Sequence, residues 1–378
     1  MEQILKIKKR ILVCPLDWGL GHATRCVPVI RELIKQDVEV ILGGDQLPMA
    51  FLKTEFPELE SVKLPGYDIR YPKNGNMILK MLSLMPKTLL HISREHYLLQ
   101  KIIDSHRIDA VISDNRFGLW SNKVPCVFIT HQVMIKSPFL EKFLYRINKR
   151  FIHHYNECWI PDFAGEDNLS GDLSHKFPLP GNVKFVGPLS RFKHSSNENF
   201  IPQKEFKYDI AVIISGPESQ RSIFEKMVLE QLQKTTLKGV VVRGIPGVGE
   251  AFRLNDTIEV FSHLDSESLR EIIWSSEIIL SRPGYSTIMD LSVLNKKAVF
   301  VSNLGQTEQE YLAEYLVKKN LALCYSQKEF NLETALLKKD KIKPLIISKE
   351  NSNLLTEAVD SFLTGVKTQE QGTDLHHI

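Results

Sequence analysis

The stretch SRPGYSTIMDLSVLNKKAVFVSNLGQTEQ, residues Ser281–Gln309, decides the fold that the sequence predicts. It follows a short apolar run typical of a buried strand, and Pro283-Gly284 then predicts a turn. Ser286 or Thr287 is predicted as the N-cap of the next helix, and another apolar strand follows at Ala298–Ser302. Strands that alternate with helices in this way are typical of a parallel α/β sheet.

Both loops of this stretch are predicted at the carboxyl ends of their strands, the edge at which α/β sheets bind ligands. The helix that begins there points its positive N-terminus into the same crevice, which favours an anion such as a diphosphate. Asp290 lies three or four residues into that helix, within reach of a sugar hydroxyl beside the anion. The stretch therefore predicts a nucleotide or nucleotide-sugar site, with candidate binding residues at Ser281, Arg282, Gly284, Ser286, Thr287, Asp290, Glu308 and Gln309.

Length and composition place this site in a soluble protein of two domains. The 378 residues are too many for one typical domain, and the 43% hydrophobic and 25% charged residues are typical of full globular cores. A net charge of +3 is too small to predict a nucleic-acid partner. The five cysteines form no CxxC pair, which indicates reduced thiols rather than disulfides or zinc ligands. The apolar run near the N-terminus is too short for a signal peptide or a membrane span, so we expect a cytoplasmic protein.

The N-terminal half begins with a glycine-rich turn between a strand at Arg10–Pro15 and a helix. Gly19 and Gly21 let the backbone approach a ligand, but the loop lacks the third glycine of the dinucleotide-binding fingerprint. His22 at the helix start has two interpretations. It is either a residue that caps or solvates the helix, or a base that takes a proton from a hydroxyl near neutral pH.

Two further strands of this half end in polar residues that we expect at the same edge as His22. Asp114 follows the strand at Asp109–Ser113 and is either a plain helix N-cap or the carboxylate that orients and stabilises a protonated His22. His131 follows the strand at Cys126–Thr130. We therefore predict a catalytic pair, His22 and Asp114, and further ligand contacts at Gly19, Gly21 and His131, which the resemblance given below assigns to an acceptor site.

Two basic amphipathic stretches lie in the same half. Met77–Ile103 mixes apolar side chains with lysines and arginines, and Pro86 predicts that it forms two helices. Phe139–Phe151 repeats the pattern. The stretches are interpreted either as helices that cover the sheet or as a surface that contacts lipid, so peripheral membrane contact stays open.

The second half repeats the strand–turn–helix pattern after a polar linker. A strand at Tyr208–Ser215 leads into another turn and helix N-terminus suited to an anion, and two later strands end in Arg243 and in His263-Leu264. Three loops thus converge on one ligand. The binding residues predicted for these additional loops are Gly216, Ser219, Gln220, Arg221, Arg243, His263 and Leu264.

The predicted fold class is α/β, with two Rossmann-like domains that face each other across a cleft. The C-terminal end of the chain is polar and predicts disorder. In chain order we expect an N-terminal acceptor-binding domain at 1–190, a linker at 191–206, a C-terminal nucleotide-sugar donor-binding domain at 207–350, a helix at 351–364 and a disordered tail at 365–378.

Two such domains resemble the GT-B glycosyltransferase fold. The motifs resemble those of the lipid-linked N-acetylglucosaminyltransferase of peptidoglycan synthesis and its relatives in the UDP-glycosyltransferase superfamily. Gly19–His22 (GLGH) resembles the acceptor loop of that group, Ser215–Arg221 (SGPESQR) its diphosphate loop, and SRPGYSTIMD with GQTEQEYLA its donor signature. The correspondence covers about residues 10–320, and only its C-terminal part is specific.

The resemblance implies roles for individual residues. Asp290 takes the acidic position that bonds the ribose hydroxyls. Glu308 and Gln309 take the positions that contact the donor sugar. His263 and Leu264 fall where the backbone meets uracil.

The resemblance also implies the reaction, an inverting hexosyl transfer from a UDP-sugar to an acceptor hydroxyl. His22 would be the base, and the helix N-termini near Ser219 and Ser286 would stabilise the leaving diphosphate with Arg221, Arg243 or Arg282. No cofactor is implied, and no metal either, because the chain has no DxD motif. The acceptor is unknown, and a lipid or lipid-linked acceptor at the inner face of a membrane stays open.

Three alternatives stay open beside this function. The Gly19–Arg25 loop also resembles UDP-sugar hydrolases of nonulosonic acid biosynthesis, in which water takes the place of the acceptor. A UDP-sugar 2-epimerase on the same fold would need several carboxylates in the cleft. A nucleotide-sugar-binding protein without turnover is the alternative from another class.

Overall fold

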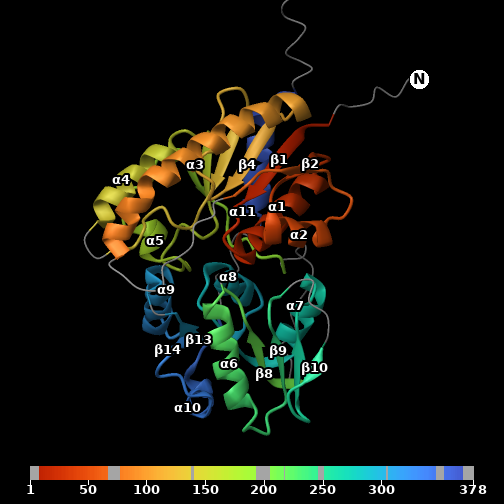
Figure 1. The fold of residues 1–378 in the computed structure, drawn as a ribbon, viewed down its shortest axis with the longest axis vertical. Coiled ribbons are helices and arrows are strands. Elements are labelled where there is room, and N and C mark those ends of the chain that lie inside the picture. The colour runs from red at the N-terminus through yellow and green to blue at the C-terminus, as the bar shows by residue number, and fades with distance from the viewer. Residues whose placement is uncertain are drawn as a thin grey trace, which may run out of the picture.

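Two α/β lobes make up the protein, each built around a seven-stranded sheet (Figure 1). The computed structural model describes residues 8–66, 77–137, 140–192, 205–216, 218–245, 251–303, 305–345 and 353–368. The predicted fold class, α/β with two Rossmann-like domains, is confirmed. Most of the linker and most of the tail predicted from the sequence lie outside the described residues.

The N-terminal sheet has the strand order β3-β2-β1-β4-β5-β6-β7, and every adjacent pair is parallel. This doubly wound order changes direction between β1 and β4, and ligands bind at the carboxyl ends of the strands at such a switch point. The strands are β1 (Arg10–Pro15), β2 (Glu39–Gly44), β3 (Ser61–Lys63), β4 (Ala110–Asp114), β5 (Cys126–Ile129), β6 (Glu157–Ile160) and β7 (Val183–Phe185).

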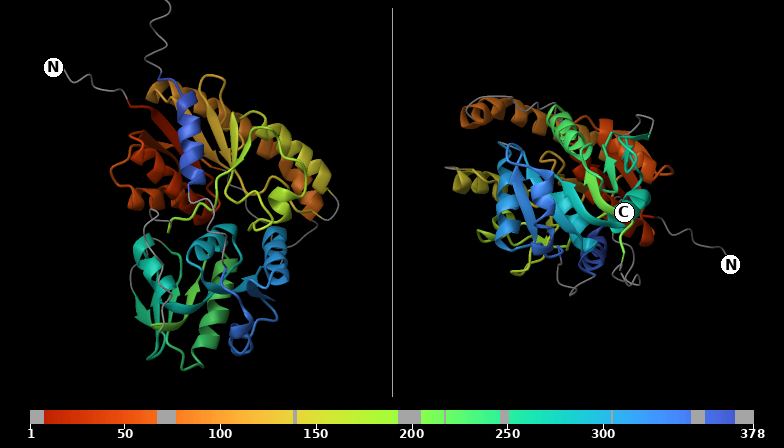
Figure 2. Two further views of the ribbon diagram at one scale, coloured as in Figure 1. Left: turned by 180° about the vertical axis from the view of Figure 1, so that it is seen from behind. Right: turned by 90° about the horizontal axis from the view of Figure 1, so that it is seen from below.

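Helices cover both faces of this sheet (Figures 1 and 2). Helix α1 buries Val27, Ile30 and Leu33, whose spacing puts them on one face, against one side of the strands. The other side of the sheet packs against Leu99 and Ile103 of α3. The helices are α1 (Leu20–Lys35), α2 (Gln46–Glu55), α3 (Met77–His106), α4 (Glu141–Ile152) and α5 (Asp172–His175).

The C-terminal sheet has the order β10-β11-β9-β8-β12-β13-β14, in which only the pairing of β10 with β11 is antiparallel. Its strands are β8 (Tyr208–Ile213), β9 (Gly239–Val242), β10 (Phe252–Arg253), β11 (Ile258–Phe261), β12 (Ser276–Ser281), β13 (Lys297–Ser302) and β14 (Ala322–Ser326). Its helices are α6 (Gln220–Leu232), α7 (Ser266–Trp274), α8 (Tyr285–Val293), α9 (Thr307–Lys318), α10 (Leu332–Leu336) and the 3₁₀ turn η1 (Lys339–Lys341).

The last helix, α11 (Leu354–Gly365), crosses back and packs on the N-terminal lobe, as the view from behind shows (Figure 2). Phe362 of α11 is buried and contacts the ring of Trp159 in β6 edge to face, with the centroids 6.0 Å apart. Nζ of Lys9 donates to the carbonyl of Leu363 at 2.6 Å. The end of the chain therefore completes the core of the first lobe.

Two expectations about helices were wrong. Met77–His106 is one helix that continues through Pro86, and its C-terminal part is held to the sheet by buried side chains such as Leu99. Helix α8 begins at Tyr285 and its N-cap is Gly284, so neither Ser286 nor Thr287 caps it. Both hydroxyls lie in the first turn instead, which leaves Ser286 free for the contact described below.

Candidate active site

His22 lies in the first turn of α1, beside the switch point of the N-terminal sheet. Gly19 precedes the helix with φ 84°, a left-handed conformation that glycine adopts at little cost. Nδ1 of His22 lies 2.6 Å from Oδ1 of Asp114, the last residue of β4. The His22 side chain is 15% exposed and that of Asp114 is fully buried. No helix follows Asp114 between residues 115 and 125, all of which the structure describes, so the N-cap interpretation of Asp114 was wrong.

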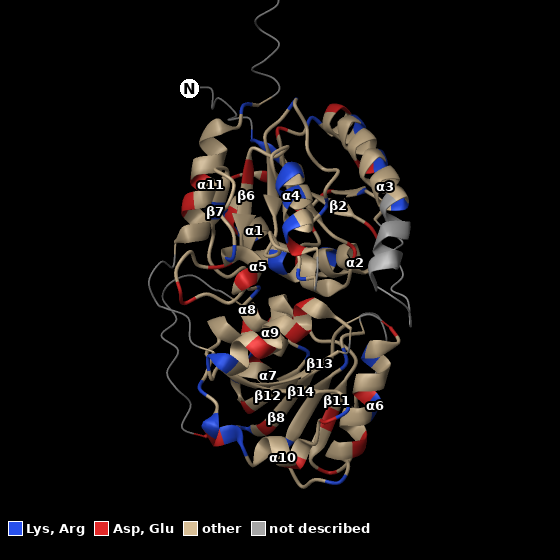
Figure 3. Cartoon of the chain, turned by 90° about the vertical axis from the view of Figure 1, so that its left-hand side faces the viewer, with Lys and Arg blue, Asp and Glu red and all other residues tan. Residues whose placement is uncertain are grey.

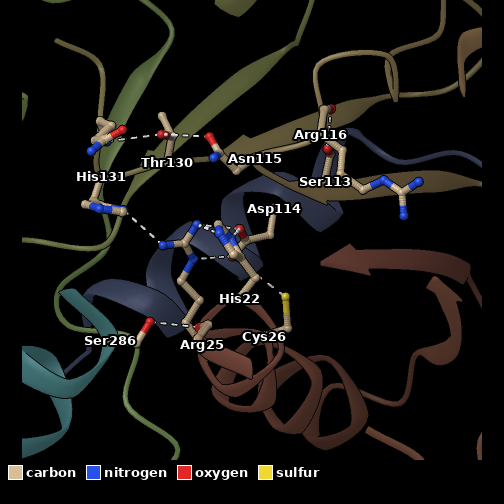
Figure 4. Close-up of polar contacts among 12 residues, drawn as sticks. His22, Arg25, Cys26, Ser113, Asp114, Asn115, Arg116, Thr130, His131 and Ser286 are labelled. Carbon is tan, nitrogen blue, oxygen red and sulfur yellow. Dashed lines mark hydrogen bonds and ion pairs between the residues drawn. The ribbon is translucent and has the colours of Figure 1, made fainter. Parts of the chain in front are cut away.

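Arg25 joins this pair from one turn further along α1 (Figure 4). Its side chain is 2% exposed. Nε and Nη2 donate to the two carboxylate oxygens of Asp114, and Nη2 also lies 2.8 Å from Nδ1 of His22. Nη1 lies 2.9 Å from Nδ1 of His131, which is the second residue after the end of β5. One guanidinium therefore contacts all three predicted polar residues of the N-terminal lobe.

The charges of this cluster favour a neutral His22. Burial, and next the charge of Arg25, lower the pKa of His22 against the opposing effect of Asp114. Burial works to raise the pKa of Asp114, but the charges and hydrogen bonds of Arg25 and His22 together hold that pKa below its usual range. Nδ1 of His22 lies 2.6 Å from Asp114, which only accepts, and 2.8 Å from Nη2 of Arg25, which only donates. We assign the proton to Nδ1 on the shorter contact, so the approach of Nη2 is not a hydrogen bond and Nε2 keeps its lone pair. Nε2 has no hydrogen-bond partner within the described part of the chain.

Contacts continue from this cluster into the C-terminal lobe through His131. Nε2 of His131 lies 2.8 Å from Oε1 of Glu308, in the first turn of α9. The ring of Tyr285, the first residue of α8, stacks on the His131 ring with the centroids 4.2 Å apart and the planes at 3°. Burial works to raise the pKa of Glu308, but the charge and hydrogen bond of His131 hold that pKa below its usual range. A residue predicted on the acceptor side and one predicted on the donor side thus touch across the two lobes.

The two predicted ligand loops also meet through a hydrogen bond from a side chain to a backbone carbonyl. Oγ of Ser286 donates to the carbonyl of Gly21 at 2.8 Å (Figure 4). A Cβ atom at Gly21 would lie 3.0 Å from that oxygen, closer than most side chains approach. Glycine at position 21 therefore permits the donor loop to rest against the loop that carries His22.

Arg282, one of the three arginines predicted to face a diphosphate, makes its hydrogen bonds within the C-terminal lobe. It is 3% exposed, donates to the carbonyl of Val301 at 3.0 Å, and also bonds the side chain of Gln327. Its guanidinium lies 4.3 Å from the centre of the Phe224 ring. Burial lowers the pKa of Arg282 to about 10. These contacts make Arg282 a support for the strand ends.

Arg221 and Arg243 share one carboxylate. Arg221 lies 2.6 Å from Glu225 and 2.7 Å from Glu218, and Nε of Arg243 lies 2.5 Å from Glu225. Two positive charges are therefore balanced by two negative ones beside the predicted diphosphate loop. Ser219, the N-cap of α6, makes no capping hydrogen bond with its side chain, so its hydroxyl is available beside the helix N-terminus.

Asp290 lies away from the His22 cluster, where α8 meets the segment that leaves the N-terminal lobe. Its Oδ1 accepts a hydrogen bond from Ser190 at 2.7 Å, and its Oδ2 lies 3.5 Å from Nε of Arg191. Burial raises the pKa of Asp290 against the opposing effects of Arg191 and Ser190. Burial, and next the charge of Arg191, lower the pKa of the nearby His263. The position predicted to hold ribose is thus tied to the connection between the lobes.

The other predicted donor residues lie at the carboxyl edge of the C-terminal sheet. Gly216 has φ 111°, and Oε1 of Gln309 accepts from the amide of Asn303 at 3.4 Å. Across the part of the chain that the structure describes, no group of three or more His, Cys, Asp or Glu is placed to hold a metal ion. The rest of the predicted set, placed at strand ends or helix starts there, is Gln220, Leu264, Ser281, Gly284 and Thr287.

The C-terminal lobe, which contains these strand ends, is similar to a known protein family. Residues 213–360 match the model of the glycosyltransferase family 28 C-terminal domain. This half is therefore similar to a glycosyltransferase domain. An uncharacterized glycosyltransferase of Methanosarcina acetivorans is 24% identical over 335 residues, which cover 81% of each chain.

Two further comparisons extend to nearly the whole chain. The UDP-N-acetylglucosamine–N-acetylmuramyl-(pentapeptide) pyrophosphoryl-undecaprenol N-acetylglucosamine transferase of Buchnera aphidicola is 21% identical over 347 residues, covering 86% of this chain and 87% of that one. The crystal structure of CalG4, the calicheamicin glycosyltransferase, superposes with a TM-score of 0.63 at 12% identity. The superposition covers 96% of this chain and 100% of CalG4. The chain has the GT-B fold, and the findings together support a glycosyltransferase.

Two residues of this candidate site were missed from the sequence. Arg25 lies three residues after His22, a spacing that puts both side chains on one face of a helix, and this spacing could have indicated their contact. Tyr285 carries no such signal, because the His131 ring on which it stacks belongs to the other lobe.

Proposed function

We propose that this protein is an inverting glycosyltransferase that moves a sugar from a UDP-sugar to an acceptor hydroxyl, with His22 as the base. The observation that carries the proposal is the hydrogen bond from Ser286 to the Gly21 carbonyl. It puts the predicted donor loop against the loop that bears His22, and so supports a reaction between ligands of the two lobes. The name of the Buchnera relative, a UDP-N-acetylglucosamine-dependent transferase, supports UDP as the carrier of the donor.

In this mechanism Nε2 of His22 takes the proton of the acceptor hydroxyl. The acceptor oxygen attacks the anomeric carbon from the face opposite UDP, the bond between that carbon and the diphosphate breaks, and UDP leaves with the electron pair. The proton stays on His22, where the carboxylate of Asp114 stabilises the charged imidazole. Closure of the lobes excludes water that would otherwise hydrolyse the donor.

Negative charge builds on the departing diphosphate, and we assign its stabilisation to the N-termini of α6 and α8. Backbone amides and the helix dipole stabilise an anion at such positions. Arg282 is occupied by a carbonyl and an amide oxygen, and Arg221 and Arg243 are neutralised by Glu225 and Glu218. The hydroxyl of Ser219, the N-cap of α6, completes the site, because the Ser286 hydroxyl already donates to Gly21.

Donor binding is tested by thermal unfolding in the presence of nucleotides. UDP, UDP-glucose, UDP-galactose and UDP-N-acetylglucosamine are expected to raise the Tm, because a ligand at 100 times its Kd stabilises the fold by about 2.7 kcal/mol. ADP, GDP and dTDP serve as controls and are expected to leave the Tm unchanged. A chain stabilised equally by all diphosphates would contradict the choice of UDP.

The base is tested with His22→Gln, which keeps a neutral side chain able to bond Asp114. Transfer, measured as UDP release in the presence of acceptor, is expected to fall by about 10²- to 10⁴-fold while the Tm shift with UDP-sugar persists. Free sugar formed from the donor alone, at the same rate as UDP release in the presence of acceptor, would instead identify a hydrolase. Unchanged UDP release in His22→Gln would remove His22 from the mechanism.

We further propose that the acceptor is reached at a membrane surface through α3 and α4. Leu89, Leu90 and Tyr97 of α3 are 50%, 70% and 58% exposed, and Phe143 of α4 is 51% exposed. Exposed basic residues surround them, with several on α4 facing the viewer in Figure 3. Apolar side chains beside lysines and arginines suit the headgroup region of an anionic bilayer. No helix among the described residues is both long and apolar enough to cross a bilayer, so this contact would be peripheral.

Vesicle co-sedimentation tests this surface. Phosphatidylglycerol vesicles are expected to bind the protein, and Leu89→Glu/Leu90→Glu is expected to weaken binding at least tenfold, because each buried leucine contributes about 1.5–3 kcal/mol. Leu337→Glu is the matched control, since Leu337 is 81% exposed on the C-terminal lobe. Equal loss in the control, or none in the double variant, would reject this surface.

A further inference from the structure

We propose that Arg25 is a positioning residue that keeps His22 neutral as a base and fixes His131 against Glu308. The proposal rests on the proposed function, because it takes His22 as the proton acceptor and Glu308 as a donor-sugar contact. Arg25 itself, 2% exposed and enclosed by the cluster, would touch neither substrate.

The shape of the guanidinium accounts for its contacts. Two nitrogens of Arg25 hold both oxygens of Asp114, and the third reaches Nδ1 of His131 at 2.9 Å. A planar fork of five N–H donors can make these bonds at once, whereas the ammonium of lysine is a single point charge. The carboxylate of Asp114 is thereby held still on one side, while its Oδ1 lies 2.6 Å from Nδ1 of His22 on the other.

The charge of Arg25 matters as much as its shape. A buried histidine beside a lone carboxylate tends to bind a proton and would then be useless as a base near neutral pH. Arg25 and Asp114 together carry no net charge, so His22 lies beside a neutral pair. In agreement, the pKa of His22 is lowered, first by burial and then by Arg25.

Titratable groups that face the cluster from its neighbours include Cys26, Tyr285, His131 and Glu308. Burial raises the pKa of Tyr285 well above its usual value, so this hydroxyl stays uncharged. Burial, and next Asp114, raise the pKa of the Cys26 thiol well above its usual value, so this group stays uncharged. The charge of His131 would lower the pKa of His22, in the same direction as Arg25. Glu308 contacts His131, and its negative charge is directed at that ring.

Arg25 also determines which nitrogen of His131 carries the proton. A guanidinium only donates, so Nδ1 of His131 must accept from it, and the proton of a neutral ring is then on Nε2. That N–H donates to Oε1 of Glu308 at 2.8 Å. The orientation of Glu308 toward a donor sugar therefore depends on a residue in the other lobe.

The test follows the histidine titrations by NMR in the substrate-free protein, with the His22 signals among the 12 histidines assigned by their loss in His22→Gln. Arg25→Gln is expected to raise the pKa of His22 by about one unit or more, because removal of a neighbouring charge has effects of that size. Arg25→Lys keeps the positive charge, so the pKa of His22 is expected to stay close to its wild-type value. Arg253→Gln, the same change of charge at a 70% exposed side chain in the other lobe, is expected to leave His22 unmoved.

Two measurements keep the test decisive if Arg25→Gln does not fold. Asp114→Asn leaves the charge of Arg25 beside His22, and the pKa of His22 is expected to fall further. In the wild-type protein the ¹⁵N shifts of His131 are expected to show a bare Nδ1 and a protonated Nε2. A protonated Nδ1 of His131, or a His22 titration that is the same in wild type, Arg25→Gln and Asp114→Asn, would overturn the proposal.

Turnover separates this proposal from the proposed function. The acid limb of the UDP-release profile is expected to move to higher pH in Arg25→Gln by the shift seen in NMR. If NMR shows the shift but no UDP-sugar is turned over or bound, the role of Arg25 in the cluster stands and the proposed function fails. If UDP-sugars are turned over but the acid limb of Arg25→Gln coincides with that of wild type, the role of Arg25 is overturned alone.

Discussion

Asp17, in the loop between β1 and α1, is expected to destabilise the fold at neutral pH, and its replacement by Asn is expected to stabilise it. The Asp17 side chain is 6% exposed, and neither carboxylate oxygen has a hydrogen-bond partner among the residues that the structure describes. The closest positive charge, Nη1 of Arg116, is 4.0 Å away. Arg116 gives a closer bond, 2.7 Å, to Glu95, so Asp17 is left as the unpaired member of the group.

The size of the effect follows from the pKa of Asp17. Burial raises it from 3.8 to about 6, against the opposing charge of Arg116. A difference of about two units corresponds to about 3 kcal/mol of lost stability. Because the folded form binds its proton more tightly, the loss is absent below pH 4, grows between pH 4 and 6, and is complete above pH 6. An imperfectly bonded Asn amide costs about 1 kcal/mol, so Asp17→Asn is expected to gain about 2 kcal/mol at pH 8.

Thermal unfolding at pH 8 and pH 4 measures this gain. About 2 kcal/mol corresponds to a rise in Tm of about 4–8 °C at pH 8, and no rise is expected at pH 4. Glu95→Gln is the matched control, a buried carboxylate that has its partner. Its neutralisation removes the closest counter-charge of the buried Arg116 and is expected to lower the Tm, because breaking a buried ion pair costs several kcal/mol. A lower Tm for Asp17→Asn at pH 8 would refute the reasoning.

Three further substitutions test the packing around the site. Arg282→Leu is expected to lower stability by about 3 kcal/mol in urea unfolding, because it removes charged hydrogen bonds to buried oxygens. Ser286→Ala removes the hydrogen bond to Gly21 and is expected to make closure of the lobes less favourable by about 1 kcal/mol. In small-angle scattering titrations, closure is then expected to need an about fivefold higher concentration of UDP-sugar. Phe362→Ala is expected to cost about 3–5 kcal/mol and to speed proteolysis of the N-terminal lobe around Trp159, although the residue lies near the chain end.

The central strands of both sheets could be predicted from the sequence because they are buried on both faces. β1 and β12 are continuous apolar runs bounded by turn residues, and the structure places strands within a residue or two of them. β3, β10 and β14 were missed, and all three are edge strands with few buried side chains. An edge strand contributes less to the core, so its sequence carries a weaker apolar signal.

The pairing of His22 with Asp114 could be predicted for a related reason. Both follow strands next to the switch point, and the order of a doubly wound sheet brings such residues together. A position at the end of a strand does not indicate whether the side chain is already hydrogen-bonded to neighbouring residues. Arg282 directly follows β12 and Asp290 lies in α8, the helix after it, yet one is bonded to Val301 and the other to Ser190. Those partners come from distant parts of the chain, where no local pattern reveals them.

The two ring nitrogens of His131 contact different lobes, and only one of these contacts depends on the charge of the ring. Nδ1 of His131 accepts from Arg25 only when it carries no proton, and Nε2 then has the proton that bonds Glu308 in the other lobe. A proton on Nδ1 would face the guanidinium donor and break the first of these contacts, with a second positive charge beside His22. The doubly protonated ring would still donate from Nε2 to Glu308, so a proton on Nδ1 is expected to break the contact with Arg25 and to leave the contact between the lobes in place.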